Sequence, residues 1–239
     1  MPARKPVIVA LDCDSAEALS LAHSLRGRIE WLKVGMTLYY AEGPRIVAQL
    51  RELGFEVFVD LKLHDIPHQV AGAAASIART GAAMMTVHAS GGCAMMRAAV
   101  ESARRAAEEV GLRPPAVIAV TVLTSIDDAG LVEIGVGRSA IQQVSLLAGL
   151  AREAGVDGVV CSPNEAKLMR ELLGGEALIV TPGVRPDWAE ARDQARTATP
   201  AAALEAGATH LVIGRPITGA PDPAHAADRI LSEIEEGTL

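Results

Sequence analysis

The chain has 239 residues, which suits one large domain or two small ones, and half of its residues are hydrophobic, enough for a sizeable buried core. Aromatic residues make up only 3%, so this core must consist of Ala, Val, Leu and Ile. The net charge of −7, without a basic run, argues against nucleic acids and anionic membranes as partners, and an anionic ligand would need local Lys and Arg.

The first apolar run, Val7 to Leu11, stops at Asp12 and is too short for a signal peptide or a membrane span. The three cysteines are far apart, odd in number and without metal-binding spacing (Cys13, Cys93 and Cys161). We therefore expect thiols buried as small apolar side chains in a cytoplasmic protein, with no disulfide framework and no metal.

Short β-branched runs alternate with Ala-, Leu-, Glu- and Arg-rich stretches along the chain. The runs predict eight strands, at Val7–Leu11, Trp31–Gly35, Glu56–Leu61, Met84–His88, Ala116–Thr121, Gly158–Cys161, Leu178–Thr181 and His210–Gly214. The stretches predict helices at Ala16–Leu25, Gly43–Leu53, Val70–Thr80, Met95–Val110, Gln142–Ala154, Pro163–Leu173, Ala201–Ala206 and Pro223–Ile234.

This alternation is typical of βα units around a parallel sheet that is buried on both faces. Eight units in this length predict an α/β fold, a (β/α)8 TIM barrel, as a single domain over residues 1–239. An open doubly wound sheet is the alternative, although the chain lacks a Gly-x-Gly-x-x-Gly turn after the first strand.

Two connections are unusually long: residues 124–139 after the fifth strand and 182–199 after the seventh. They lack apolar periodicity, which favours lids over a site, with passive surface loops as the alternative. The second connection ends in Thr199-Pro200, an N-cap followed by a proline at the first helical position.

Charged and polar residues recur where the predicted strands end. In a (β/α)8 barrel all these ends lie on one face, where active sites are built. Taken singly, each residue could be an N-cap, a solvated strand end or half of a structural ion pair, but the collection on one rim predicts a site. Its members are Asp12, Lys33, Asp60, Lys62, His88, Thr124, Arg185, Gly214 and Arg215.

The densest group follows the third strand. Asp60 and Lys62 are two residues apart, so in a strand they share a face, and Asp65 lies near the start of a helix opened by Ile66-Pro67. His64 is expected to point away from Lys62. His88 has no carboxylate or second histidine at metal-ligand spacing nearby in the sequence, and it is more typical of a core histidine.

The pair Gly214-Arg215, at the end of the eighth strand, suits a phosphate. Glycine lets backbone N–H groups approach an anion, and arginine offers a fork of donors.

The motif Asp60-Leu61-Lys62-Leu63-His64-Asp65-Ile66-Pro67 resembles that of the orotidine 5'-phosphate decarboxylase family. The similarity covers nearly the whole chain. Among its other matching segments are Lys33-Val34-Gly35-Met36, Thr181-Pro182-Gly183-Val184-Arg185 and Gly214-Arg215-Pro216-Ile217-Thr218.

The resemblance implies conversion of orotidine 5'-phosphate to uridine 5'-phosphate (UMP) and CO2 in de novo pyrimidine biosynthesis, without a cofactor, by a homodimer with shared active sites. It implies a catalytic network of Lys33, Asp60, Lys62 and Asp65. Lys62 would protonate C6 of the pyrimidine, and Asp65 would come from the neighbouring subunit.

The resemblance also implies the substrate contacts. Asp12 and Lys33 would hold the ribose hydroxyls and Thr124 the pyrimidine edge. The 5'-phosphate would lie among Arg185, Gln194, Gly214 and Arg215. The chain departs from the family at Gln69, where the family commonly has a Thr that helps to bind ribose.

Two alternatives remain from the sequence. One is a metal-dependent sugar-phosphate decarboxylase or aldolase on the same barrel. Such relatives share an Asp-x-Lys-x-x-Asp motif, but they tend to carry a metal-binding carboxylate where this chain has Lys33. The other is a non-catalytic sensor of a phosphate ligand, which the cost of collecting so many charges argues against.

Overall fold

The computed structural model describes residues 6–186, 188 and 198–237. Its eight strands are all parallel and close into a barrel in sequence order, each strand pairing with the next and β8 pairing with β1. The strands are β1 Val7–Leu11, β2 Trp31–Gly35, β3 Glu56–Leu63, β4 Met84–His88, β5 Ala116–Val120, β6 Gly158–Val160, β7 Leu178–Pro182 and β8 His210–Ile213. The predicted (β/α)8 barrel is therefore confirmed, and the open sheet is wrong.

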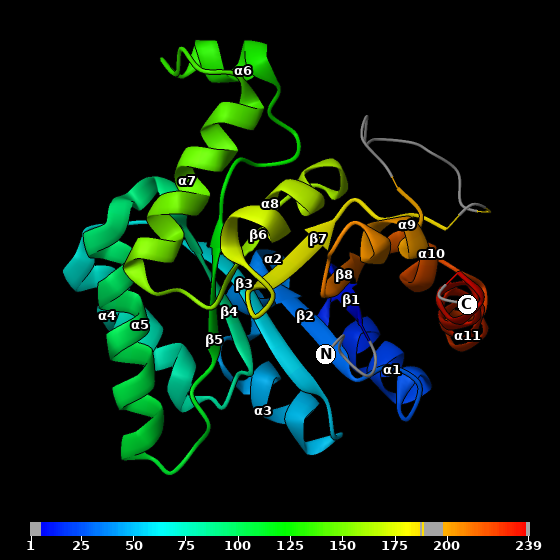
Figure 1. Ribbon diagram of the computed structural model, residues 1–239. Helices are drawn as coiled ribbons and strands as arrows, with labels where there is room; N and C mark the ends of the chain where they lie inside the picture. Colours follow the sequence, from blue (N-terminus) through cyan, green and yellow to red (C-terminus); the bar gives the residue numbers. More distant parts are fainter. Residues whose placement is uncertain (1–5, 187, 189–197, 238–239) are drawn as a thin grey trace.

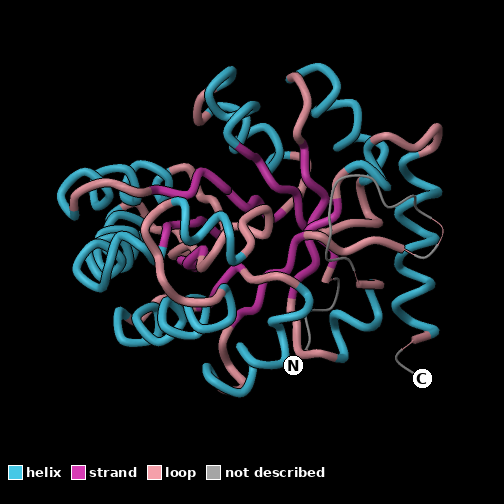
Figure 2. Tube along the Cα trace, turned by 90° about the horizontal axis from the view of Figure 1, so that it is seen from above, coloured by secondary structure: helices cyan, strands magenta, loops and turns pink. Residues whose placement is uncertain are grey.

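Helices lie around the strands on the outside of the barrel, as the view from above shows (Figure 2). They are α1 Ser15–Leu25, α2 Met36–Glu42, α3 Arg45–Glu52, α4 Pro67–Arg79, α5 Gly92–Glu109, α6 Asp128–Glu133, α7 Ala140–Ala154, α8 Ala166–Leu173, α9 Pro200–Glu205, α10 Arg215–Thr218 and α11 Pro223–Glu236, with 3-10 turns η1 Ala89–Gly91 and η2 Pro163–Glu165. Thr199 caps α9 through its hydroxyl, as predicted, by accepting from the Ala202 N–H at 3.2 Å.

The core has two layers, and both consist mainly of aliphatic side chains. Inside the barrel, the buried residues Ile8, Phe58, Met84, Ile118 and Val180 fill the space between the strands. The second layer, between strands and helices, is rich in alanine, which lets α4 and α5 pack closely, as seen at the left of Figure 1. Alternation along each strand separates these layers, so the last inward side chain of a strand faces the barrel mouth.

Three helices lie where the sequence analysis expected none. α2 follows β2 directly, α10 follows β8, and α6 lies within the 124–139 connection, which was expected to be a structureless loop. α6 begins at the N-cap Asp127, whose carboxylate accepts from the Gly130 N–H at 2.9 Å, and it buries Leu131. With only six residues, α6 is too short to show a detectable apolar period in the sequence. In Figure 1, α6 and the start of α7 project beyond the rest of the barrel.

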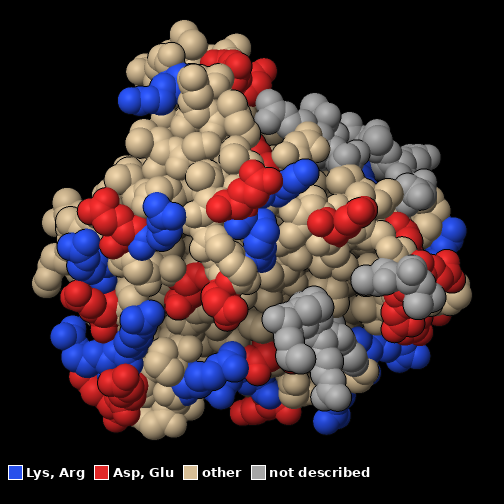
Figure 3. Space-filling view, in the orientation of Figure 1, with Lys and Arg blue, Asp and Glu red and all other residues tan. Residues whose placement is uncertain are grey.

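The surface carries charges of both signs. On the face shown in Figure 3, Lys and Arg side chains are interspersed with Asp and Glu rather than joined into a basic area. Within the described part of the chain, no helix combines the length and hydropathy that crossing a bilayer requires.

Candidate active site

A cavity of about 320 Å³ opens at the carboxyl ends of the strands. Of the ten residues to which the family resemblance assigns a role, the structure brings eight to its wall: Asp12, Lys33, Asp60, Lys62, Thr124, Arg185, Gly214 and Arg215. They come from the ends of β1, β2, β3, β7 and β8 and from the connection after β5. Residues far apart in sequence therefore meet because parallel strands deliver all their ends to one rim.

The other two of these ten residues are not on this wall. Asp65 is exposed, and its Oδ1 accepts a hydrogen bond from the adjacent Ile66 N–H at 2.6 Å. It lies in the connection between β3 and α4, outside the cavity formed by its own chain. Gln194 lies outside the described residues.

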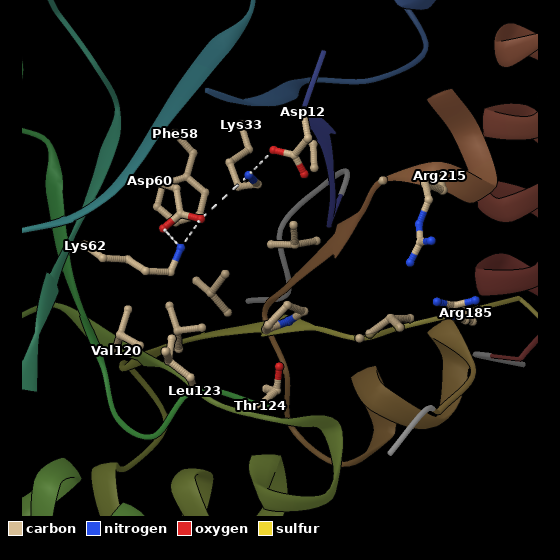
Figure 4. Close-up of a pocket in the computed structure, with 18 of the residues that line it drawn as sticks. Asp12, Lys33, Phe58, Asp60, Lys62, Val120, Leu123, Thr124, Arg185 and Arg215 are labelled. Atoms are coloured by element: carbon tan, nitrogen blue, oxygen red, sulfur yellow. Dashed lines mark hydrogen bonds and ion pairs between the residues drawn. The ribbon is translucent and has the colours of Figure 1, made fainter. Parts of the chain in front are cut away.

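Two lysines and two aspartates form a linked ionic cluster on one side of the cavity (Figure 4). Lys62 Nζ lies 2.9 Å from both carboxylate oxygens of Asp60. Lys33 Nζ lies 2.9 Å from Asp12 Oδ1 and 3.7 Å from Asp60 Oδ2. The order of charges is therefore Asp12, Lys33, Asp60, Lys62, alternating in sign with no net charge.

Burial differs along this cluster. The side chains of Lys33 and Asp60 are 9% and 13% exposed, whereas that of Lys62 is 26% exposed and reaches toward the cavity. Apolar side chains, including Phe58, Val120 and Leu123, form the adjacent wall. Such a wall lowers the local dielectric, so the charges interact more strongly than they would in water.

The backbone at Lys62 differs from the regular strand that the sequence analysis assumed. Lys62 has φ +53°, and it is the one residue other than glycine with positive φ among the described residues. β3 pairs with β4 at Val59↔Met85 and next at Leu63↔Val87, so the register shifts across the motif. Asp60 and Lys62 do face the same side, but within a bulge rather than through strand alternation alone.

Gly35 leaves room for the ionic cluster. A Cβ at this position would lie 2.9 Å from Asp12 Oδ1 and 3.0 Å from Lys33 Nζ. Its φ of −87° is open to any residue, so a larger side chain here would not strain the backbone but would displace the carboxylate of Asp12 and the ammonium of Lys33. The glycine at the end of β2 therefore belongs to the architecture of the site.

The opposite side of the cavity carries two arginines, with the hydroxyl of Thr124 between the two sides (Figure 4). Arg215 begins α10 directly after Gly214, and Arg185 follows β7. The Arg185 N–H donates to the Ala198 carbonyl at 3.0 Å, beside a bridge between Val184 and Ala198, which closes the base of the long connection after β7. The cavity thus has an ionic cluster of balanced charge on one side and two guanidinium groups on the other.

The two histidines near the motif lie outside the cavity wall. The rings of His64 and His88 pack with centroids 5.4 Å apart. Burial, followed by the charges of His64 and Lys62, lowers the pKa of His88. A neutral, half-buried His88 agrees with the expectation of a core histidine.

Thr86 is the site residue that sequence reasoning missed. It is 1% exposed in the middle of β4, and its hydroxyl contacts both Asp60 and Lys62. A polar residue within the apolar strand Met84–His88 was the available signal. The apolar wall was missed too, because valines and leucines at strand ends look the same in sequence whether they line a core or a cavity.

Among the described residues, no group of three or more His, Cys, Asp or Glu side chains is placed to hold a metal ion. The fold and the cavity together define a (β/α)8-barrel protein with a pocket at the carboxyl ends of its strands, where barrel enzymes place their active sites.

Comparison with known proteins gives the family. Residues 5–230 match the model of the "Orotidine 5'-phosphate decarboxylase / HUMPS family". The chain is 54% identical over 229 residues to an orotidine 5'-phosphate decarboxylase of Alkalilimnicola ehrlichii, covering 95% of each chain. It is 50% identical over 230 residues to that of Paramagnetospirillum magneticum, covering 96% of this chain and 98% of the relative.

The likeness extends to solved structures. The crystal structure of orotidine 5'-phosphate decarboxylase from Lactobacillus acidophilus matches with a TM-score of 0.85 at 39% sequence identity, over 96% of this chain and 99% of that one. The chain therefore belongs to the orotidine 5'-phosphate decarboxylase / HUMPS family.

Proposed function

We propose that this chain decarboxylates orotidine 5'-phosphate to UMP and CO2, the step that yields UMP in pyrimidine biosynthesis, with Lys62 as the proton donor. The observation that carries the proposal is the contact of Lys62 Nζ with both oxygens of Asp60, 2.9 Å each, at the wall of the cavity. Family membership and the names of the relatives support the activity.

The reaction needs fixed positive charge at one atom. When the bond from C6 to the carboxylate breaks, the electron pair stays on C6 in the plane of the ring, where the π system cannot spread it. A Lys62 ammonium directed at C6 stabilises this pair and then transfers a proton to it, forming the C6–H bond of UMP. The neutral amine regains a proton from solvent.

Asp60 has two roles in this scheme. Its carboxylate holds Lys62 by both oxygens and therefore fixes the direction of the ammonium. It would also face the carboxylate of the substrate, and two like charges about 4 Å apart repel by roughly 4 kcal/mol at an effective dielectric of 20. Each 1.36 kcal/mol corresponds to about tenfold in rate, so repulsion contributes, and preorganised charge around C6 supplies the larger part.

The separation of charges in the cavity fits the shape of a nucleoside monophosphate. The cluster of Lys33, Asp60 and Lys62 occupies one side and the two arginines the other. We assign the 5'-phosphate to Arg185, Gly214, Arg215 and Gln194, the ribose hydroxyls to Asp12 and Lys33, and the pyrimidine edge to Thr124. The phosphate is remote from C6, so its binding energy can be used to align the reacting end.

The position of Asp65 supports a homodimer with shared sites. Its carboxylate is exposed at the barrel mouth and lies outside its own chain's cavity wall. A second copy of the chain would therefore receive Asp65, next to its Lys62, and complete an alternating network of charges. Ile66, next to Asp65 in the chain, is an exposed apolar side chain that would offer apolar area for the contact.

The test is a spectrophotometric assay of the purified protein with orotidine 5'-phosphate, with and without EDTA, alongside Lys62→Ala. We expect turnover that is insensitive to EDTA, and a loss of about 10⁴-fold or more in Lys62→Ala, because the variant lacks both the proton donor and the fixed charge. Loss of activity with EDTA would favour a metal-dependent reaction on a sugar phosphate. Binding of the nucleotide without product would indicate a sensor.

A further inference from the structure

The hydroxyl of Thr86 connects the two central residues of the ionic cluster. It accepts from the Lys62 backbone N–H at 2.9 Å and donates to Asp60 Oδ1, also at 2.9 Å. The roles are fixed by chemistry, since a backbone N–H only donates and a carboxylate only accepts. With a residue exposure of 1%, no water can replace the hydroxyl without a change in packing.

Thr86 stands where the ladder between β3 and β4 is interrupted. Between the pairs Val59↔Met85 and Leu63↔Val87, β3 has three intervening residues and β4 has one, which is Thr86. The side chain of Thr86 supplies the acceptor that a backbone carbonyl would supply in a regular ladder. It does so for Lys62, the residue with φ +53°, a conformation that a side chain other than glycine rarely adopts.

We propose that Thr86 is a positioning residue for the decarboxylation, holding the Lys62 backbone and the Asp60 carboxylate in register. The inference rests on the proposed function and deepens it. Lys62 reaches the cavity from a backbone that the hydroxyl stabilises, and its ammonium is held by a carboxylate that the same hydroxyl orients. One hydroxyl thus fixes both the position of the Lys62 backbone and the direction of its ammonium group.

The consequence concerns turnover more than binding. Thr86 lies outside the cavity wall, and the proposed phosphate residues Arg185 and Arg215 are on the opposite side of the cavity. Valine has the shape of threonine without its hydroxyl, so Thr86→Val leaves the Lys62 N–H unpaired and removes a donor from Asp60. A displacement of about 1 Å at a reacting group costs about 100-fold in rate. We expect kcat to fall by about 10- to 100-fold, with KM changed by about twofold or less.

The experiment compares kcat and KM for orotidine 5'-phosphate in wild type, Thr86→Val, Thr86→Ser and Thr121→Val, with urea unfolding of each. Thr121 is the matched control: it is 3% exposed, its hydroxyl donates to the Val160 carbonyl at 3.0 Å, and it lies outside the cavity wall. We expect Thr86→Ser to restore most of kcat because it keeps the hydroxyl. Thr121→Val should lose stability while keeping the kcat of wild type.

The inference is overturned if Thr86→Val keeps the kcat of wild type, if Thr86→Ser is as slow as Thr86→Val, or if Thr121→Val is equally slow. Should Thr86→Val not fold, Thr86→Cys takes its place, since a thiol is a weaker donor and acceptor in the same position, and the same outcomes apply. An inactive wild type would instead overturn the proposed function, so the two failures are distinguishable.

Discussion

Lys62 Nζ lies 2.9 Å from both carboxylate oxygens of Asp60, and the backbone that carries this lysine is left-handed, with φ +53°. A close ionic contact and an unfavourable backbone therefore meet at one residue. Conformations of this kind persist only when the surroundings hold them, and they are concentrated at functional sites. The cost in stability at Lys62 is the first quantity to measure.

The backbone cost can be isolated by comparing Lys62→Gly with Lys62→Ala. Both variants lack the ammonium, but only glycine adopts positive φ without a steric penalty, which is about 1–2 kcal/mol for other residues. Glycine loses more conformational entropy on folding than alanine, and this loss offsets part of the steric advantage. We therefore expect Lys62→Gly to be more stable than Lys62→Ala by about 1 kcal/mol in urea unfolding. Equal stabilities would mean that the bulge relaxes in the variants.

The proposed sharing of the site between two subunits can be tested by subunit complementation. A heterodimer of Asp65→Ala and Lys62→Ala chains would contain one site with both residues intact. If equal amounts of the two chains exchange subunits at random, half of the dimers are heterodimers, and each of these has one intact site of two. The mixture should therefore recover about a quarter of the wild-type activity. Mixing Asp60→Ala with Lys62→Ala chains is the control and should restore nothing, because both residues serve the cavity of their own chain. Verified heterodimers without activity would place Asp65 outside the site.

Arg215 is expected to act through the phosphate. Arg215→Ala should lower kcat/KM for orotidine 5'-phosphate by at least about tenfold, as a charged hydrogen bond contributes about 1.5–3 kcal/mol. With orotidine, which lacks the phosphate, wild type and variant should differ by less than about twofold. Arg104→Ala, on the exposed side of α5, is the control. A normal kcat/KM for Arg215→Ala, or an equal loss with both substrates, would contradict the assignment.

His210 predicts a loss of stability in acid that is independent of catalysis. It is buried inside the barrel against Trp31, and burial lowers its pKa from 6.5 to about 4. Between these values the unfolded chain binds the proton and the native chain does not, so the contribution is complete above pH 6.5 and is lost as the pH falls toward 4. The total loss is about 3 kcal/mol, of which about 2 kcal/mol has occurred at pH 5.

The measurement for His210 is the free energy of unfolding at pH 7.5 and pH 5 in wild type, His210→Gln and His225→Gln. His225 is exposed on α11 and serves as the control. We expect His210→Gln to be less stable than wild type at pH 7.5 but to lose about 2 kcal/mol less on acidification. The same pH dependence in all three proteins would show that the His210 ring is hydrated in the native state.

The sequence by itself determined the barrel and most of the rim. Eight β-branched runs alternating with helical stretches allow few other folds, because parallel strands need crossovers and bury both faces. Once the strands are known, their ends are known too, and so Asp12, Lys33, Asp60, Lys62 and Arg215 could be assigned to one face before any coordinates. The short helix α6 was not predicted because its six residues are too few to show an apolar period.

Only the tertiary structure decided how the charges are linked. The positive φ of Lys62, the shifted register of β3 and the hydroxyl of Thr86 between Asp60 and Lys62 all depend on which atoms of β4 face β3. Strand alternation gives the face of a side chain, but a bulge is set by pairing with a neighbour that lies 24 residues further along the chain. Long-range contacts of this kind leave no local pattern in the sequence, and here they hold Lys62, the proposed proton donor, in place.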